Sequence, residues 1–439
     1  MAKCKTKQLE FASCQNLKVQ ADFHGGEVSS DGGLLLIREV ERRLNLLKRA
    51  SEILPDPRNP ELITHTRYSQ ICQRVFSLVQ GYEDLNDHQS LRNDTLLQTV
   101  AGQKDILSSP STLCRMEAQG NRHCAKALNE LLVEVFIESY TQAPEELILD
   151  FDATDDPVHG QQEGSFFHGY YGHYCFLPLY VFCESQPLCA WLRPANTDPA
   201  RGSWAVLKML VSRLRQVWPQ TKIIFRADSG FCRWRMLRWC ENNGVKYVVG
   251  FARNARTKAA NQDLLEKAAT QHQATGEKQR HLRAGTYQAK SWDRPRNLIT
   301  KVEHNEHGPN LRHVLSNLEG TPEEIYDEIY CARGDMENRI KEQQMGLFAD
   351  RTSCQRWWPN QLRLLESTLA YVLVDGLRRL GLKGTDWASK QVTTLRCQLL
   401  KVGAVLIRNT RRVLVHIASS WPGEEIYRHA HQRLRQSSE

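Results

Sequence analysis

The chain has 439 residues, of which 41% are hydrophobic and 25% charged, a composition typical of a globular protein with room for two or three domains. Its net charge of +8 makes a polyanionic partner plausible without identifying one. The 13 cysteines include no C-x-x-C pair, which argues against a disulfide framework or a zinc site and for reduced thiols. Neither a signal peptide nor a membrane-spanning apolar run is visible, so we expect a cytoplasmic protein without a membrane partner.

The first 140 residues are predicted to be mainly α-helical. Apolar residues recur at helical spacing over residues 71–79, and an amphipathic run extends over residues 123–140. Another helix is expected to begin near Pro110, because polar capping residues surround a proline in its first turn. This short helix could read DNA as part of a helix-turn-helix, with Arg115 facing the groove, or it could belong to an ordinary helical bundle.

A strand that ends in carboxylates is predicted at residues 147–154. Side chains alternate between the two faces of a strand, so Asp150 and Asp152 share one face and Phe151 lies on the other. A carboxylate at the centre of a sheet is costly unless a charge or a metal neutralises it. The acidic face therefore indicates either a cation-binding site or a solvated edge strand.

The elements after this strand indicate an α/β core. They are expected as strands at residues 174–183 and 188–193, a helix at 203–217, a strand at 221–227, a helix at 231–243 and a strand at 245–251. The first three strands are predicted to be antiparallel neighbours, and the later strands alternate with helices. This order predicts a ribonuclease H-like catalytic core whose first part occupies residues 141–253.

The rest of the chain is expected to interrupt, complete and extend this core. Residues 254–325 begin polar and then give short strand candidates, which predicts an inserted β-rich subdomain. The core resumes over residues 326–380 with a long helix. Residues 381–439 mix arginines with apolar positions and are predicted to form a basic helical region.

Three carboxylates are candidate metal ligands. Asp152 lies on the first acidic strand, Asp228 directly follows a later strand, and Glu337 falls on the long helix. Two strand-borne aspartates and one helix-borne glutamate suit a pair of divalent cations that hold the attacking and leaving oxygens of a phosphoryl transfer. Hard oxygen ligands predict two Mg²⁺ ions, or Mn²⁺ in their place.

Four side chains share one face of the glutamate-bearing helix. They fall at positions i, i+3, i+7 and i+11, namely Tyr330, Arg333, Glu337 and Lys341. Arg333 and Lys341 could hold DNA phosphates, and Tyr330 could stack on a base or donate to a phosphate. The alternative is a ladder of ion pairs on a solvated helix, which any surface helix can carry.

Four short motifs mark the candidate site. They are Leu-Asp-Phe-Asp-Ala-Thr at residues 149–154, Leu-Arg-Pro-Ala-Asn at 192–196, Asp-Ser-Gly-Phe at 228–231 and Tyr-x-x-Arg-x-x-x-Glu at 330–337. In these motifs and in their order the chain resembles the DDE transposases, specifically the insertion-sequence family thirteen-eighty, over nearly its whole length. That family places its first catalytic aspartate just before a small residue and a threonine, which favours Asp152, with Asp150 as the alternative.

Two departures from the family pattern are visible. The related signature places a lysine seven residues after the glutamate, where this chain has Gln344, so Lys341 is expected to stand in. Some relatives carry a tryptophan directly after the signature arginine, where this chain has Gly334. A base-flipping step that relies on such a ring would have to use another residue.

The resemblance implies a cut-and-paste DNA transposase of the bacterial cytoplasm and nucleoid. It implies double-stranded DNA partners, namely terminal inverted repeats and target DNA, and a homodimer on paired ends. Asp152, Asp228 and Glu337 would hold the metal ions, and residues 1–140 would read the repeats.

Arginines on the helix that follows the second aspartate would add sequence-independent DNA affinity, together with those of the C-terminal region. On the helix they are Arg233, Arg235 and Arg238. Two alternatives stay open: a metal-dependent DNA nuclease on the same fold, and a DNA-binding derivative without catalytic activity. Hydrolysis and strand transfer use the same metal ions, so the carboxylates do not separate the nuclease from the transposase.

Overall fold

The computed structural model describes residues 8–158 and 160–436, which form two compact units. The core unit contains residues 53–55 and 117–372. The terminal unit is assembled from stretches that are far apart along the chain, residues 8–52, 56–116 and 373–436. In the described residues, no helix combines the length and the apolar character that crossing a membrane requires.

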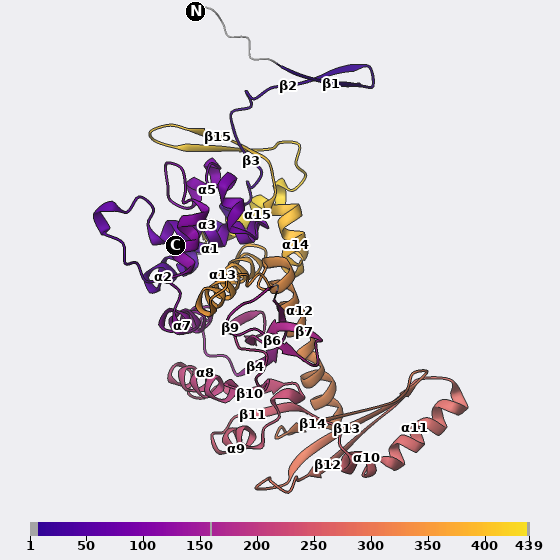
Figure 1. The fold of residues 1–439 in the computed structure, drawn as a ribbon. Coiled ribbons are helices and arrows are strands. Elements are labelled where there is room, and N and C mark those ends of the chain that lie inside the picture. Colours follow the sequence, from indigo (N-terminus) through magenta and orange to yellow (C-terminus); the bar gives the residue numbers. More distant parts are fainter. Residues whose placement is uncertain (1–7, 159, 437–439) are drawn as a thin grey trace, which may run out of the picture. The chain divides into compact units, whose positions relative to one another are not determined.

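An eight-stranded mixed sheet lies at the centre of the core unit (Figure 1). Its strands are β4 (Glu146–Ala153), β8 (Leu179–Cys183), β9 (Gln186–Trp191), β10 (Lys222–Ala227), β11 (Lys246–Phe251), β12 (Gln279–Tyr287), β13 (Arg296–Asn305) and β14 (Gly308–Ser316). Their order across the sheet is β12-β13-β14-β11-β10-β4-β8-β9. β10 runs parallel to both β4 and β11, whereas the other neighbours are antiparallel. The mixed α/β class predicted from the sequence is confirmed.

Helical segments pack on both faces of this sheet. Those of the core unit are α7 (Arg122–Glu138), α8 (Ser203–Val217), η3 (Ser229–Phe231), α9 (Trp234–Asn242), α10 (Ala255–Ala259), α11 (Gln262–Thr275), η4 (Glu324–Tyr330), η5 (Cys331–Arg333), α12 (Gly334–Lys341) and η6 (Glu342–Gly346). Helices α7, α8 and α9 contribute buried side chains to the apolar cluster on one face. Segment η4 contributes Ile325 and Tyr326 to the cluster on the other face. The unit boundary falls within α13 (Trp357–Gly376).

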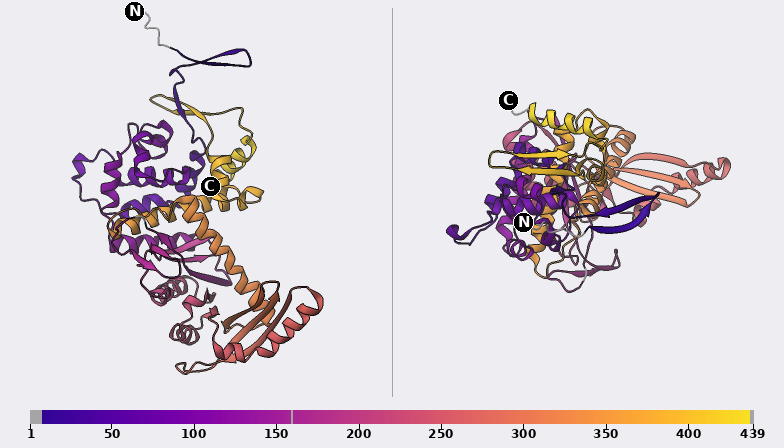
Figure 2. Two further views of the ribbon diagram at one scale, coloured as in Figure 1. Left: turned by 45° about the vertical axis from the view of Figure 1, so that its right-hand side comes forward. Right: turned by 90° about the horizontal axis from the view of Figure 1, so that it is seen from above.

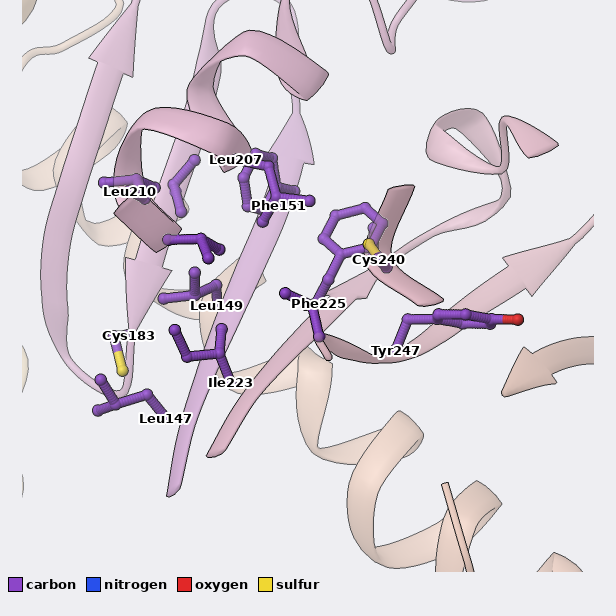
Figure 3. Packing of buried hydrophobic residues seen from close by; sticks show 14 of the residues in the cluster. Leu147, Leu149, Phe151, Cys183, Leu207, Leu210, Ile223, Phe225, Cys240 and Tyr247 are labelled. Carbon is purple, nitrogen blue, oxygen red and sulfur yellow. The ribbon is translucent and has the colours of Figure 1, made fainter. Parts of the chain in front are cut away.

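The alternation of side chains along β4 fixes which face of the strand is apolar. Leu147, Leu149 and Phe151 are at most 1% exposed and lie in one cluster with Ile223 and Phe225 of β10 (Figure 3). Burial of a side chain of this size contributes about 1.5–3 kcal/mol to stability. A slip of one residue would expose this whole set, so the apolar face also fixes the direction of the acidic face.

The strand predicted over residues 174–183 is wrong, because the chain forms two strands there. β7 (His173–Phe176) ends before Pro178, and β8 begins after it. Proline has no backbone N–H for a sheet and restricts the residue before it. β7 joins a separate three-stranded sheet of order β5-β7-β6, with β5 (Asp156–Pro157) and β6 (Phe166–His168).

The range 254–325 contains α10 and α11, followed by the strands β12, β13 and β14. These strands do not form a sheet of their own. β14 pairs antiparallel with β11, so the three strands extend the central sheet at one edge (Figure 1). Leu264 and Leu265 of α11 pack against a cluster that includes Val302 of β13.

The terminal unit combines helices with short strands. Its strands are β1 (Leu9–Cys14), β2 (Leu17–Ala21), β3 (Glu27–Ser29), β15 (Ala404–Arg408) and β16 (Val413–Ile417). Its helical segments are α1 (Leu34–Leu44), α2 (Leu46–Ile53), η1 (Pro60–Leu62), α3 (Arg67–Gln80), η2 (Leu85–Asp87), α4 (His88–Leu91), α5 (Thr95–Val100), α6 (Pro110–Glu117), η7 (Leu377–Gly381), η8 (Asp386–Ser389), α14 (Val392–Leu395), η9 (Arg396–Leu400) and α15 (Glu424–Gln436).

The helical character predicted for most of the N-terminal region and for the C-terminal region needs correction. β15 pairs with β16 and also with β3, so the two regions share one small sheet. Residues 404–407 and 413–417 are short runs rich in β-branched side chains, which favour strands. The arginines around them do not oppose a strand, because they lie mainly in the connecting turn.

N-terminal and C-terminal segments of the chain pack against each other in the terminal unit (Figure 2). Arg396 donates hydrogen bonds to the carbonyls of Val79 and Leu78 at the end of α3. A Cβ atom at Gly33 would lie 2.4 Å from the Cα atom of Leu400, so only glycine permits this approach. The N-terminal helices are therefore completed by residues from the other end of the sequence.

Candidate active site

Two neighbouring parallel strands bring the first two carboxylates together. In the register of β4 and β10, Phe151 lies opposite Ala227, so the next position places Asp152 beside Asp228. β10 ends there, and Asp228 caps the following η3 turn because its Oδ1 accepts a hydrogen bond from Gly230 N at 2.8 Å. Both carboxylates thus lie at the carboxyl edge of adjacent parallel strands.

Asp150 forms a buried ion pair instead of facing the cleft. Its two oxygens accept hydrogen bonds from Nε and Nη2 of Arg226 at 2.5 and 2.6 Å, and the two side chains are 4% and 8% exposed. Arg226 Nη1 also donates to the carbonyl of Ile329 at 2.5 Å. One guanidinium therefore joins β4, β10 and the helical segment that leads to Glu337.

Glu337 lies in the first turn of α12 with a side chain that is 42% exposed. Arg333 Nη2 donates a hydrogen bond to Glu337 Oε1. Nη1 of the same arginine lies 3.8 Å from Asp152 Oδ1. The Arg333 guanidinium is thus placed between a carboxylate of the sheet and a carboxylate of the helix.

Burial and charge act against each other in this cluster. Burial raises the pKa of Asp152 to about 7, Arg333 opposes this rise, and the neighbouring carboxylates Asp228 and Glu337 add to it. Burial also raises the pKa of Asp228. Burial disfavours the charge on Arg333, yet Asp152 and Glu337 together raise its pKa. The site therefore has excess negative charge that a cation would stabilise.

A cleft of about 740 Å³ joins five of the residues singled out from the sequence. They are Asp152, Asp228, Arg333, Glu337 and Lys341. Gln344, at the position where the family signature has lysine, also lines this cleft. Its Nε2 donates to the carbonyl of Asp155 at 2.8 Å, so this position connects η6 to the end of β4.

Tyr330 does not line this cleft. Its ring lies 5.6 Å from that of Tyr326, and burial raises the pKa of its hydroxyl. A Cβ atom placed on Gly250 would be 2.7 Å from Tyr330 Oη. The hydroxyl therefore lies against β11, close to the Asp228 turn, and not free in the cleft.

The arginines expected to hold DNA have other partners in the structure. Arg233 Nη2 lies 2.5 Å from Asp198 Oδ2, and Arg238 Nε lies 3.8 Å from Asp293 Oδ2. Arg235 lies over the ring of Trp234, with its Cζ atom 5.4 Å from the ring centroid. The side chains of Arg233 and Arg238 are about half exposed, so exchange of their carboxylate partners for a phosphate would cost little.

Arg115 belongs to the terminal unit, on α6. Its Nη2 donates to Thr112 Oγ1 at 3.1 Å, one turn earlier on the same helix. The side chain is exposed, as a DNA-reading role would require.

The chemistry of the donor set suits hard divalent cations, although the side chains are not yet arranged around one. Among residues 8–158 and 160–436, no group of three or more His, Cys, Asp and Glu side chains has the spacing of a ready-made metal site. Asp152 and Asp228 face the cleft, while Glu337 is turned towards Arg333. Release of Glu337 from this pair would supply a third oxygen donor of the kind that Mg²⁺ prefers.

Two residues near the site were missed in the sequence. Arg226 and Gly250 lie within apolar strands, and no local feature distinguishes Gly250 from any other strand glycine. For Arg226 a signal existed: an arginine in the middle of a buried strand requires a buried carboxylate as its partner, and Asp150 was available.

The fold and the cleft define an α/β protein in which carboxylates from adjacent strands and from a helix line one cleft. Residues 11–439 match a protein family described as "Transposase DDE domain group 1", and the chain belongs to this family. Its members are enzymes that cleave DNA and transfer strands, and they generally use divalent metal ions. The chain is thus a DDE transposase.

Comparison with solved structures gives a distant match to a chain titled "Cryo-EM structure of piggyBac transposase synaptic complex with hairpin DNA (SNHP)". The TM-score is 0.44 with 10% sequence identity, and the match covers 99% of this chain and 84% of the other. A search of curated proteins finds no match.

Proposed function

We propose that this chain is a cut-and-paste transposase of an insertion sequence of family thirteen-eighty, with a ribonuclease H-like core. The observation that carries the proposal is one cleft lined by Asp152, Asp228 and Glu337, which come from β4, the end of β10 and α12. The strand order β9-β8-β4-β10-β11 supports the ribonuclease H-like core, because three antiparallel strands are followed by two parallel ones.

The three carboxylates would hold two Mg²⁺ or Mn²⁺ ions, which would activate water and stabilise charge on the reacting phosphate when bound. We propose Asp152 as the first ligand, because Asp150 already gives both of its oxygens to Arg226. Glu337 would exchange its pair with Arg333 for this role. Arg333 and Lys341, which line the same cleft, would then hold the phosphates of the DNA strand.

The DNA partners follow from the same proposal. Terminal inverted repeats would be read by the N-terminal helices, including α6 with Arg115, and target DNA would be bound at the cleft. The arginines of α9 and of the C-terminal region would add salt-sensitive affinity after exchange with their present partners. Because two element ends have to be joined, we propose a homodimer on paired ends.

Cleavage of DNA that flanks the gene, with and without Mg²⁺, tests this function. We expect the native chain to cut at the element ends and to join a labelled 3′ end to plasmid DNA. Asp228→Asn and Glu337→Gln should each reduce cutting by at least about 100-fold, because each removes a charged metal ligand. End binding, measured by anisotropy, should persist in both variants.

Glu306→Gln is a matched control, because this exposed glutamate lies in the turn between β13 and β14, outside the cleft. It should cut like the native chain. If Asp228→Asn and Glu337→Gln also cut like the native chain, the proposed site is wrong. Cutting without joining would favour the nuclease, and binding without cutting would favour the inactive derivative.

A further inference from the structure

A hairpin rich in aromatic side chains borders the carboxylate cleft and has no part in the function described so far. It is formed by residues 164–176, which include β6, β7 and the turn between them. Its aromatic residues are Phe166, Phe167, Tyr170, Tyr171, Tyr174 and Phe176. The same thirteen residues contain no Asp, Glu, Lys or Arg. The surface of this aromatic hairpin therefore consists of aromatic rings and has no permanently charged side chain.

Four of these rings are turned to solvent. Phe167, Tyr170 and Tyr174 are 56%, 86% and 58% exposed, and Phe166 is 40% exposed. Phe167 and Tyr174 meet edge to face at 5.7 Å, and Tyr170 and Tyr171 meet at 5.0 Å. Exposed aromatic residues in contact with one another are costly to leave in water, so they indicate a surface that binds a partner.

The base of the aromatic hairpin is held firmly although its tip is exposed. Phe176 packs edge to face on Trp357 with ring centroids 5.5 Å apart, and a Cβ atom at Gly164 would lie 2.5 Å from that ring. Trp357 N donates to Glu163 Oε2 at 2.9 Å. The exposed rings are therefore presented by a fixed support, which lowers the entropic cost of binding.

The tip of the hairpin forms one wall of the carboxylate cleft. Tyr170, Tyr171 and His168 line the same cleft as Asp152 and Lys341. Between β6 and β7 the chain turns at Gly172, whose φ of +76° suits glycine. Tyr170 in this turn is exposed, whereas Tyr171 is partly buried against Cys175 and Leu177. A DNA strand whose phosphate reaches Asp152 would therefore bring its nearest bases within reach of these rings.

We propose that the aromatic hairpin is a stacking platform for unpaired bases of the DNA strand at the cleavage site. The inference rests on the proposed function, since it requires DNA in the cleft. Aromatic side chains stack on any base, because every base has a π-face, and uncharged rings beside Arg333 and Lys341 combine stacking with phosphate binding. The platform would hold bases next to the reacting phosphate open and in register with the carboxylates.

Photo-crosslinking tests the location of the bases. The probe is an element-end duplex whose flank ends in three unpaired nucleotides, one of them 5-iododeoxyuridine. After irradiation of the complex with the native chain, we expect the crosslinked peptide to contain residues of the aromatic hairpin, with Tyr170 as the principal site. Crosslinks confined to other peptides would overturn the proposal.

Affinity for the same probe tests the chemistry of the ring. Tyr170→Leu keeps an apolar side chain without a π-face and should bind roughly 5- to 150-fold more weakly, whereas Tyr170→Phe should bind like the native chain. On a fully paired, blunt probe the three proteins should differ much less. Trp204→Leu is the matched control, because Trp204 is 37% exposed on α8 and lies outside the cleft.

The outcomes separate this inference from the function on which it rests. If the native chain cuts end DNA with Mg²⁺ but Tyr170→Leu and Tyr170→Phe bind equally well, the platform is refuted and the transposase stands. If Tyr170→Leu changes the oligomeric mass but not DNA affinity, the rings contact a second copy of the chain, which also refutes it. If the native chain neither binds nor cuts end DNA, the proposed function itself fails.

Discussion

The ion pair between Asp150 and Arg226 shows how one side-chain pair can serve several elements. It connects adjacent parallel strands, and its third hydrogen bond reaches the carbonyl of Ile329. A buried ion pair is a weak source of stability compared with apolar packing, but the loss of one partner leaves a costly unpaired charge. Its contribution here is positional, because it connects β4, which carries Asp152, and β10, which Asp228 follows, to the segment η4 that leads to Glu337.

We expect Arg226→Met to destabilise the chain by about 3–5 kcal/mol, since Asp150 would keep a buried charge without a partner. The double variant Asp150→Leu, Arg226→Met should regain most of this stability but not the rate of DNA cleavage, because the link to Ile329 stays broken. Urea unfolding and cleavage rates measure the two effects separately. A single variant as stable as the native chain would contradict this account.

The candidate carboxylates could be predicted from the sequence because their signals are local. Asp152 and Asp228 each end an apolar run, and strand alternation gives the face on which Asp152 lies. The choice between Asp150 and Asp152 could not be made locally, because it depends on Arg226, which is brought alongside by strand pairing. The pairing of Arg333 with Glu337 is likewise a matter of side-chain conformation, which periodicity does not predict.

At the scale of elements, β11 approaches the Asp228 turn and the Tyr330 side chain more closely than a side chain at Gly250 would permit. A Cβ atom at Gly250 would lie 2.7 Å from Ser229 N and from Tyr330 Oη, and 3.1 Å from the carbonyl carbon of Asp228. Tyrosine can swing aside, but the backbone of the Asp228 turn cannot move without moving its carboxylate. A glycine inside a strand often marks a close approach of this kind.

We expect Gly250→Ala to reduce the rate of DNA cleavage by at least about 10-fold, since small displacements of reacting groups are costly. Overpacking should also lower the free energy of unfolding by about 1–3 kcal/mol. Gly285→Ala on β12 is the matched control, because the nearest atom to its Cβ would be Leu298 O at 4.0 Å. Equal cleavage rates for the two variants would show that the contact at Gly250 is not functional.

Element boundaries were predicted less well than element types. The division of residues 174–183 into β7 and β8 follows from Pro178, a signal that was present but outweighed by the apolar run around it. β5 and β6 have only two and three residues, too few to give a period, so the sequence predicts no strand over residues 155–172. The strands β15 and β16 are not predicted, because the arginines of the turn between them favour a basic helical region.

At the scale of the whole molecule, the terminal unit depends on residues from both ends of the sequence. Gly376 lies against Val40 of α1, and Arg396 satisfies carbonyls at the end of α3. The sequence predicts these ends as separate regions, because contacts between distant segments produce no periodic pattern in either segment. Their joint fold is a non-local property.

We expect deletion of residues 373–439 to unfold the N-terminal helices. Their buried faces would lose the side chains that cover them, and the carbonyls at the end of α3 would lose their hydrogen bonds from Arg396. Limited proteolysis should then cut within residues 34–100, and we expect these residues to resist cleavage in the native chain. Deletion of residues 8–21 is the control, because every residue of β1 and β2 is exposed. Protection of residues 34–100 in the shortened chain would contradict this dependence.

The divided construction of the terminal unit has a consequence for synthesis on the ribosome. At translation rates of about 5–20 residues per second, the segment that completes the N-terminal helices emerges on the order of tens of seconds after them. During that interval the core unit can be synthesised and can fold. The apolar faces of α1 and α3 stay exposed to solvent, because residues 373–436 that cover them have not yet been made. Translation that stops before residue 373 would therefore produce an aggregation-prone fragment and not a partly functional enzyme. The terminal unit can fold only after translation is complete.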